Sequence, residues 1–284
     1  MVARTKATDP ARTASTAGIL RPDELARHVE LRRWPCDPAV DRWVENHWAL
    51  RWDLPPGTGH QSQTLPHPTC SLTLEVGDHT RDGLPPGETL LVTGVVTRRF
   101  DVEIRGSGRV VGVRFRPGGL AALTGARARD WVDAVVPARE VLPAEVCAAL
   151  AEPPLAEAPE RWAALAEDAL ASVGAAPDER HDLLLAVCAA MLDDHDLLAV
   201  ADVAERFATT PRTLQRLFLD LVGVGPKWVL GRYRMHDAVA ELDAGFEGPL
   251  TDLAHRWGWY DQAHFTRDFT ALVGVTPGRY RDRG

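Results

Sequence analysis

Two short stretches of the chain carry arginine, glutamine, histidine and threonine where a helix would leave them exposed. The first set is Arg212, Thr213, Gln215 and Arg216, and the second is Gln262, His264, Thr266 and Arg267. Arginine can donate two hydrogen bonds to a guanine edge and glutamine can pair similarly with adenine, whereas histidine and threonine suit single bonds. Spacings of one, three and four residues place each set near one face of a helix. These side chains could therefore recognise the base edges of a nucleic acid.

The two stretches belong to an internal repeat. "TPRTLQRLFLDLVGVGP" at 210–226 aligns with "DQAHFTRDFTALVGVTP" at 261–277, at a constant offset of 51. The segments before them, "AVADVA" at 199–204 and "PLTDLA" at 249–254, align at an offset of 50. Arg216 thus has Arg267 as its counterpart, and the repeat predicts two copies of one structural unit.

Each copy has the pattern of a short helix, a turn and a second helix. The second helices, expected at about 211–221 and 262–273, have inward apolar residues three and four positions apart. These residues are Leu214, Leu217, Phe218 and Leu221 in the first copy, and Phe265 and Phe269 in the second. The pattern is typical of the helix-turn-helix, whose second helix lies in the DNA major groove. A helical bundle that binds no nucleic acid would show the same periodicity and stays an alternative.

The ends of these second helices carry local signals. Thr210, followed by proline, and Asp261 are the expected N-caps. Gly223 and Gly274 stand where a left-handed residue would stop each helix.

A helical pattern from Pro226 to about Asp243 joins the two units. Its roughly 18 residues span about 27 Å, so the two recognition helices could enter successive major grooves about one DNA turn, roughly 34 Å, apart. Phosphate contacts are expected from Thr210, Lys227, Arg232, Arg234 and Arg279. Residues 179–284 contain 12 Lys and Arg against 16 Asp and Glu, which weakens a purely electrostatic case for DNA binding.

The composition of the 284 residues predicts a soluble, cytoplasmic protein of two domains, with 45% hydrophobic residues and a net charge of −8. That charge argues against nonspecific coating of nucleic acid. We expect a flexible tail at 1–20, a β-rich sensor or dimerisation domain at 21–140, a helical connector at 141–178 and a DNA-binding domain at 179–284. The four scattered cysteines suit reduced thiols, and no membrane helix is predicted.

The front half alternates apolar and polar residues with period two, at 72–76, 100–104 and 111–115. These segments predict antiparallel strands. The expected fold class is α+β: an N-terminal antiparallel β barrel or sandwich, followed by an all-α domain with two helix-turn-helix units joined by a long helix.

The C-terminal pattern resembles the AraC/XylS family of bacterial transcription regulators over about 187–283. The segments "PRTLQRLF", "VGVGPKWVL", "DLAHRWGWYDQAHFTRDF" and "VGVTPGRY" follow the family signature in order and spacing. The resemblance implies that Arg212, Gln215, Arg216, Gln262, His264 and Arg267 occupy base or phosphate contact positions. Ala263 departs from relatives that carry a polar residue there, and the domain is more acidic than a strong DNA binder would be.

The front half resembles the cupin-like β domains that precede this module, through "VTGVVTRRF" and "VVGVRFRPGGLAAL". In the family such domains sense small molecules, mediate dimerisation, or both. The implied partners are a double-stranded DNA operator, a small-molecule effector, a second copy of the chain and RNA polymerase, without a membrane or a cofactor. A ligand-independent regulator whose front domain only dimerises is the alternative.

A ligand pocket could use the dense tryptophans of the front half, namely Trp43, Trp48 and Trp52, together with His67. Core packing explains the tryptophans as well. His67 and Cys70 have metal-ligand spacing and could be completed by His47, His60 or His79, although nothing fixes the partner. Loop histidines and a buried cysteine are the simpler interpretation.

Two arginines, Arg114 and Arg116, alternate with apolar residues in a predicted strand, which favours an exposed polar face for both. If that face pointed inward, they would be anion ligands. No constellation of serine, cysteine or carboxylate side chains supports catalysis, so the chain is not expected to be an enzyme. A cupin-type metal-dependent enzyme domain fused to a DNA reader is the enzymatic alternative.

Overall fold

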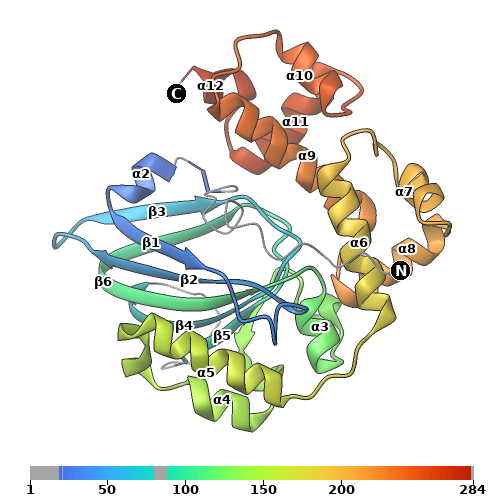
Figure 1. The fold of residues 1–284 in the computed structure, drawn as a ribbon. Helices are drawn as coiled ribbons and strands as arrows, with labels where there is room; N and C mark the ends of the chain where they lie inside the picture. Colours follow the sequence, from blue (N-terminus) through green and yellow to red (C-terminus); the bar gives the residue numbers. More distant parts are fainter. Residues whose placement is uncertain (1–18, 21, 80–87, 283–284) are drawn as a thin grey trace.

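The computed structural model describes residues 19–20, 22–79 and 88–282. The expected tail at 1–20 falls almost wholly outside this part of the chain, and so does the side chain of His79. Within the described residues, no helix is both long and apolar enough to cross a bilayer. A sheet-containing first half precedes a helical second half, which confirms the predicted α+β class (Figure 1).

An antiparallel sheet forms the first half. Its strands are β1 (Val29–Trp34), β2 (Val44–Asp53), β3 (Gly59–Thr64), β4 (Ser71–His79), β5 (Leu90–Thr93), β6 (Phe100–Phe115) and β7 (Val135–Pro137). Their order is β1-β2-β6-β4-β5-β7, with β3 paired to the first part of β6. The 16-residue strand β6 thus has β2, β3 and β4 as neighbours. Figure 1 shows this sheet curling around an interior.

Glycines of β6 leave room for two tryptophans of β2. Trp48 is paired with Gly112, and Trp52 with Gly108. A Cβ at Gly108 would lie 2.1 Å from Trp52 Cζ2, and one at Gly112 would lie 2.9 Å from Trp48 Cε2. Trp52 Nε1–H donates to the carbonyl of Arg105 at 3.0 Å. The two rings therefore lie directly against the β6 backbone.

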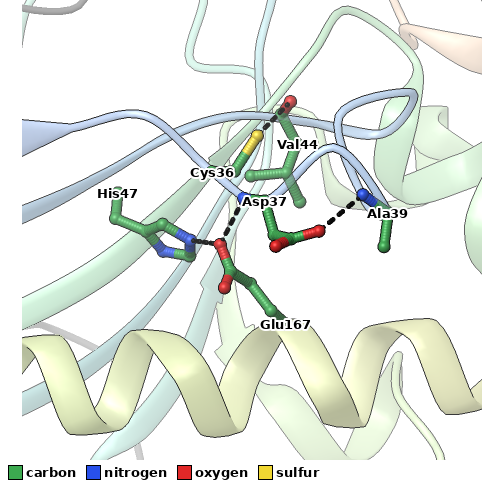
Figure 2. Close-up of polar contacts among 6 residues, drawn as sticks. All are labelled: Cys36, Asp37, Ala39, Val44, His47 and Glu167. Carbon is green, nitrogen blue, oxygen red and sulfur yellow. Dashed lines mark hydrogen bonds and ion pairs between the residues drawn. The ribbon is translucent and has the colours of Figure 1, made fainter.

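The predicted connector packs on the outside of the sheet (Figure 1). It contains α4 (Ala144–Leu150), the 3-10 turn η3 (Pro153–Glu157) and α5 (Pro159–Ser172). Trp162 is fully buried, and its Nε1–H donates to the Leu150 carbonyl at 3.1 Å. Glu167 of α5 lies 2.8 Å from His47 Nε2 on β2 and accepts the backbone N–H of Asp37 at 2.7 Å (Figure 2). The first contact joins α5 to α4, and those of Glu167 bind α5 to β2 and to the segment before it.

The remaining helices of the first half are short, and seven helices form the described part of the second half. The short ones are α2 (Pro22–Ala26), α3 (Gly119–Thr124), η1 (Ala128–Trp131) and η2 (Ala138–Glu140). The second half contains α6 (Glu179–Asp193), α7 (Val200–Arg206), α8 (Pro211–Leu221), α9 (Pro226–Asp243), α10 (Leu250–Arg256), α11 (Gln262–Val273) and α12 (Pro277–Arg281). Helices α7 and α8 form one helix-turn-helix unit, α10 and α11 form the other, and the 18-residue α9 joins them as predicted.

The hydrophobic core does not break at the predicted linker. One continuous cluster runs from the outer face of the sheet through α3 to α6, α8 and the first half of α9. A second cluster holds the second helix-turn-helix unit and includes Leu20 and Leu65 from the first half. A third cluster lies inside the sheet. The first helix-turn-helix unit therefore shares its core with the β domain.

Close approaches of backbone fix this shared core. A Cβ at Gly118 would lie 2.5 Å from a methyl of Leu184 on α6. A Cβ at Gly223, after α8, would lie 2.6 Å from a methyl of Val132, which follows η1. The second unit is held by Arg99, whose Nη1–H donates to the Val273 carbonyl at the end of α11 at 2.9 Å. Both units thus contact the β domain.

Candidate nucleic-acid interface and ligand cavity

Side-chain caps start α8 and α11, the two predicted recognition helices, as expected. Thr210 Oγ1 accepts the backbone N–H of Thr213 at 3.1 Å, and Asp261 Oδ1 accepts that of His264 at 2.7 Å. Gly223 and Gly274 follow the helices with φ of 88° and 85°, a conformation that glycine adopts without a Cβ penalty. The two helices run over Pro211–Leu221 and Gln262–Val273, so the expected bounds are confirmed.

Burial of one face orients each recognition helix. The predicted apolar residues of α8, Leu214, Leu217, Phe218 and Leu221, are all buried. In α11, Phe265 and Phe269 are fully buried with ring centroids 5.5 Å apart in an edge-to-face arrangement, a favourable aromatic geometry. The opposite faces therefore point to solvent.

The exposed faces present arginines without partners. Arg212, Gln215 and Arg216 are exposed on α8, and Gln262 and Arg267 on α11. Among the described residues, the guanidinium groups of the three arginines form no hydrogen bond or ion pair. An exposed, unpaired guanidinium keeps all its N–H donors for a ligand. The repeat thus places Arg216 and Arg267 at matching positions with the same freedom.

Other predicted contact residues are already engaged. The Gln262 side-chain carbonyl accepts the hydroxyl of Thr251 at 2.8 Å, which leaves its amide N–H groups to donate. His264 Nε2 lies 3.2 Å from Asp268, and that carboxylate also accepts Trp259 Nε1–H at 2.9 Å. The sequence reasoning missed Asp268, although its spacing of four from His264 was a visible signal.

The remaining polar residues of the two helices are half-buried or folded back. Thr213 and Thr266 are half-buried, and the Thr213 hydroxyl lies 2.9 Å from that of Thr210. The Gln215 amide lies beside the backbone of Gly225, where an added Cβ would be 3.0 Å from its Nε2. These side chains stay predicted contacts, but each has less freedom than the arginines.

The predicted phosphate contacts divide into two groups. Lys227 and Arg279 are exposed, and Thr210 is exposed with its hydroxyl used in the cap. Arg232 is half-buried and stacks over the Trp228 ring at 4.7 Å, and burial lowers its pKa to about 10. Arg234 donates to the Leu197 carbonyl at 3.1 Å. Much of the Arg232 and Arg234 guanidinium surface is therefore within the fold.

The curled sheet surrounds a partly open cavity of about 200 Å³. Three of the four predicted ligand residues, Trp48, Trp52 and His67, line it, whereas Trp43 packs against the core shared with the helices. Its lining also includes Arg114, considered above as an anion ligand on an inward face, and Arg33 and Glu75, which the sequence did not single out. The period-two alternation along the strands was the signal that could have placed these charged residues on the inner face of the sheet.

The two arginines at the end of β6 face different surroundings, which corrects the expectation that both are exposed. Arg114 lines the cavity and is half-buried. Arg116 lies after the strand, and its Nε–H donates to the Asp41 carbonyl. The alternation was read correctly, but the face that carries Arg114 is the inner one.

The proposed metal ligands are not gathered. Among the residues searched, which exclude the undescribed segments, no three His, Cys, Asp or Glu side chains cluster as metal ligands. Cys70 is buried, and burial raises its pKa to about 12, so it stays a thiol rather than a thiolate ligand. His47 contacts Glu167 on the outside of the sheet (Figure 2), and His60 lies beside His28 with ring centroids 4.7 Å apart. All four cysteines are free.

Comparisons with known proteins match two regions of the chain. Residues 32–137 match a family described as Domain of unknown function (DUF6597), and residues 203–283 match one described as Helix-turn-helix domain. Over 82 residues the chain is 34% identical to a Streptomyces lividans protein described as an AraC-like transcription regulator, covering 29% of this chain and 27% of that protein. Over 100 residues it is 36% identical to the HTH-type transcriptional activator RhaS of Escherichia coli O139:H28, covering 34% of each. The chain thus spans about a third or less of the length of these relatives.

Two solved structures were also found to be similar. The C-terminal domain of AraT, a response regulator from Geobacillus stearothermophilus, is 26% identical, with 36% of this chain and 85% of that chain covered and a TM-score of 0.33. ToxT from Vibrio cholerae is 11% identical, with 89% and 97% covered and a TM-score of 0.39. From the family match, the chain carries a helix-turn-helix domain at 203–283, and the relatives to which it is similar are described as AraC-like or HTH-type regulators.

Proposed function

We propose that the chain is a cytoplasmic, sequence-specific DNA-binding transcription regulator that reads an operator with α8 and α11. The observation that carries this proposal is the matched pair Arg216 and Arg267, both exposed and both without a partner among the described residues. Each lies about one and a half turns into its helix, in the half from which side chains would reach base edges in the major groove. Elsewhere in the same domain, Arg180 and Arg256 are paired with carboxylates.

The excess of acidic residues over 179–284 suits a DNA-binding domain that depends on specific contacts. Few phosphate contacts release few counterions, so the logarithm of the affinity should fall only shallowly with the logarithm of salt concentration. Lys227 and Arg279 are exposed and suited to such contacts. Sequence discrimination would then come from the arginines and from Gln262, whose amide donors remain available.

A response to a small molecule is the second part of the proposal. The cavity wall at Pro66 and His67 touches α9, the helix between the two recognition units. His236 of α9 lies 2.9 Å from the Pro66 carbonyl through Nε2, and its ring centroid is 4.1 Å from that of His67. A ligand that favours one position of this wall would bias α9 and therefore the spacing of α8 and α11. A homodimer and a contact with RNA polymerase are further proposed partners.

Selection of binding sites from random DNA duplexes by the full chain tests the DNA-binding proposal. We expect enrichment of two short motifs about one turn apart, lost when Arg216 and Arg267 are both replaced by alanine. Arg161, an exposed arginine on α5, provides the matched control: Arg161→Ala should select the same motif. Absence of any enriched motif with the folded wild-type chain would refute the proposal.

A further inference from the structure

The cavity changes from polar to apolar along its length, as the strand register shows. The first row across the sheet contains Arg114, Ser71 and Thr93, and the second contains Arg33, Trp48 and Thr73. The third row contains Leu31, Leu50, Val110 and Glu75, and the fourth contains Val29 and Trp52. Successive rows are two residues, roughly 7 Å, apart. Ile19, Leu25 and Ile104 join the lining and belong to the apolar cluster around Val29 and Trp52.

The polar end holds an arginine without a partner. Within the described chain, the Arg114 guanidinium forms no hydrogen bond or ion pair, although it lines the cavity and is half-buried. Two basic groups sense its charge. Burial, and after it the charge of Arg114, lowers the pKa of Arg33 to about 10 against a smaller opposing effect of Glu45. Arg114 also helps to lower the pKa of His236. A half-buried cation beside other basic groups is favoured by an anion that compensates their charge.

The carboxylate in the cavity does not provide this compensation. Glu75 lies in the third row, four residues or about 13 Å along the strands from the row of Arg114. Its Oε1 accepts the Thr73 hydroxyl at 2.8 Å. The space beside Arg114 is therefore suited to an anion supplied from outside the chain.

The volume limits the size of that anion. An engineered apolar cavity of about 150 Å³ in another protein binds benzene, so about 200 Å³ accommodates one ring and a short substituent. Trp48 and Trp52 provide flat aromatic walls, because Gly112 and Gly108 behind them have no side chains.

We propose that the cavity binds a small monocarboxylic acid, with its carboxylate on Arg114 and Arg33 and an apolar body of about one aromatic ring against Trp48 and Trp52. The inference rests on the proposed ligand response for its regulatory meaning. Binding itself needs no DNA. The ligand class follows from the unpaired guanidinium and the apolar end of the same cavity.

Thermal-shift and calorimetric titrations of the full chain with matched probes test this assignment. Phenylacetate and octanoate should bind saturably and raise the melting temperature, whereas 2-phenylethanol and 2-phenylethylamine should bind at least tenfold more weakly. Equal or tighter binding of the alcohol or the amine, or no binding of either acid at millimolar concentration, would overturn the proposal. Tighter binding of phenyl phosphate than of phenylacetate would overturn the carboxylate class.

Variants distinguish a direct role of Arg114 in ligand binding from the general effect of removing an arginine. Arg114→Gln should weaken phenylacetate binding at least tenfold, and Arg161→Gln on the outer helix should leave it unchanged. Unchanged affinity for phenylacetate in a folded Arg114→Gln chain would contradict the proposal. If that variant does not fold, the comparison of acid with alcohol in the wild type decides whether the cavity selects a carboxylate. Acid binding with unaltered operator affinity would refute the ligand response alone, and failure of the DNA selection would leave the cavity assignment intact.

Discussion

Acid should weaken the contact between α9 and the β domain, because His236 is held there as a neutral ring. Its Nε2–H donates to the Pro66 carbonyl at 2.9 Å, and its Nδ1 has no hydrogen-bond partner among the described residues. Protonation would place an N–H without an acceptor at Nδ1, near the charges of Arg114 and Arg232. Burial is the main reason that the pKa of His236 falls to about 4, and the two arginines lower it further.

The sign and size of the effect follow from this pKa. Above pH 6.5, the ordinary histidine value, the ring is neutral in both the folded and the unfolded chain. As the pH falls from 6.5 towards 4, the unfolded chain takes up the proton first, so the free energy of unfolding decreases. The loss from this single group is about 2 kcal/mol at pH 5 and about 3.4 kcal/mol well below pH 4.

Urea unfolding followed by circular dichroism at pH 8 and pH 5 measures the loss. His236→Gln keeps an N–H for Pro66 but does not titrate, so the wild type should lose about 2 kcal/mol more than this variant between the two pH values. The other buried histidines are present in both chains and cancel in the difference. His255, which is exposed, supplies the control: His255→Gln should keep the wild-type loss. An equal loss of unfolding free energy in His236→Gln and the wild type would refute the conclusion that His236 is held as a neutral, buried ring.

Three further predictions concern the recognition helices and their surroundings. Arg216→Ala and Arg267→Ala should each cost about 1–3 kcal/mol of specific binding and relax the preference at one base pair; fluorescence anisotropy on selected and scrambled sites would show a uniform loss if the residue holds phosphate instead. Thr210→Ala should lower the free energy of unfolding by about 1 kcal/mol, and Thr210→Asn should restore it, because asparagine caps equally well; no recovery in chemical denaturation would contradict the cap. Gly223→Ala should cost at least about 1 kcal/mol more than Gly245→Ala, since both have positive φ but only an added Cβ at 223 meets the β domain; equal melting temperatures would argue against that contact.

The helix-turn-helix pair was predictable because its signals are local. Thr210 and Asp261 cap the helices that directly follow them, and Gly223 and Gly274 end those helices. Such caps depend on residues within one turn of each other. Because the repeat shows each of these signals twice, the first and last residues of both helices could be predicted closely.

The cavity and the half-buried arginines could be placed only with the tertiary structure. A period of two shows that Arg114 and Val113 face opposite ways, but α5 and the shared core cover one face of the sheet while the cavity lies behind the other. Neither face of the sheet is simply exposed to solvent, so the alternation of residues could not show what surrounds Arg114. The half-burial of Arg232 was not visible in the sequence for a related reason: α9 is covered on several sides by elements far away in the sequence, and helical periodicity does not reveal them.

The shared hydrophobic core has a consequence for how such a chain can evolve. Recombination that exchanged everything after residue 178 would separate α8 from its packing partners around Gly118 and Val132, so the incoming partner would need a matching surface. The second helix-turn-helix unit has its own cluster, which among the described residues of the first half includes Leu20 and Leu65. Inheritance should therefore keep the first helix-turn-helix unit together with its β domain, while the second unit is freer to be exchanged.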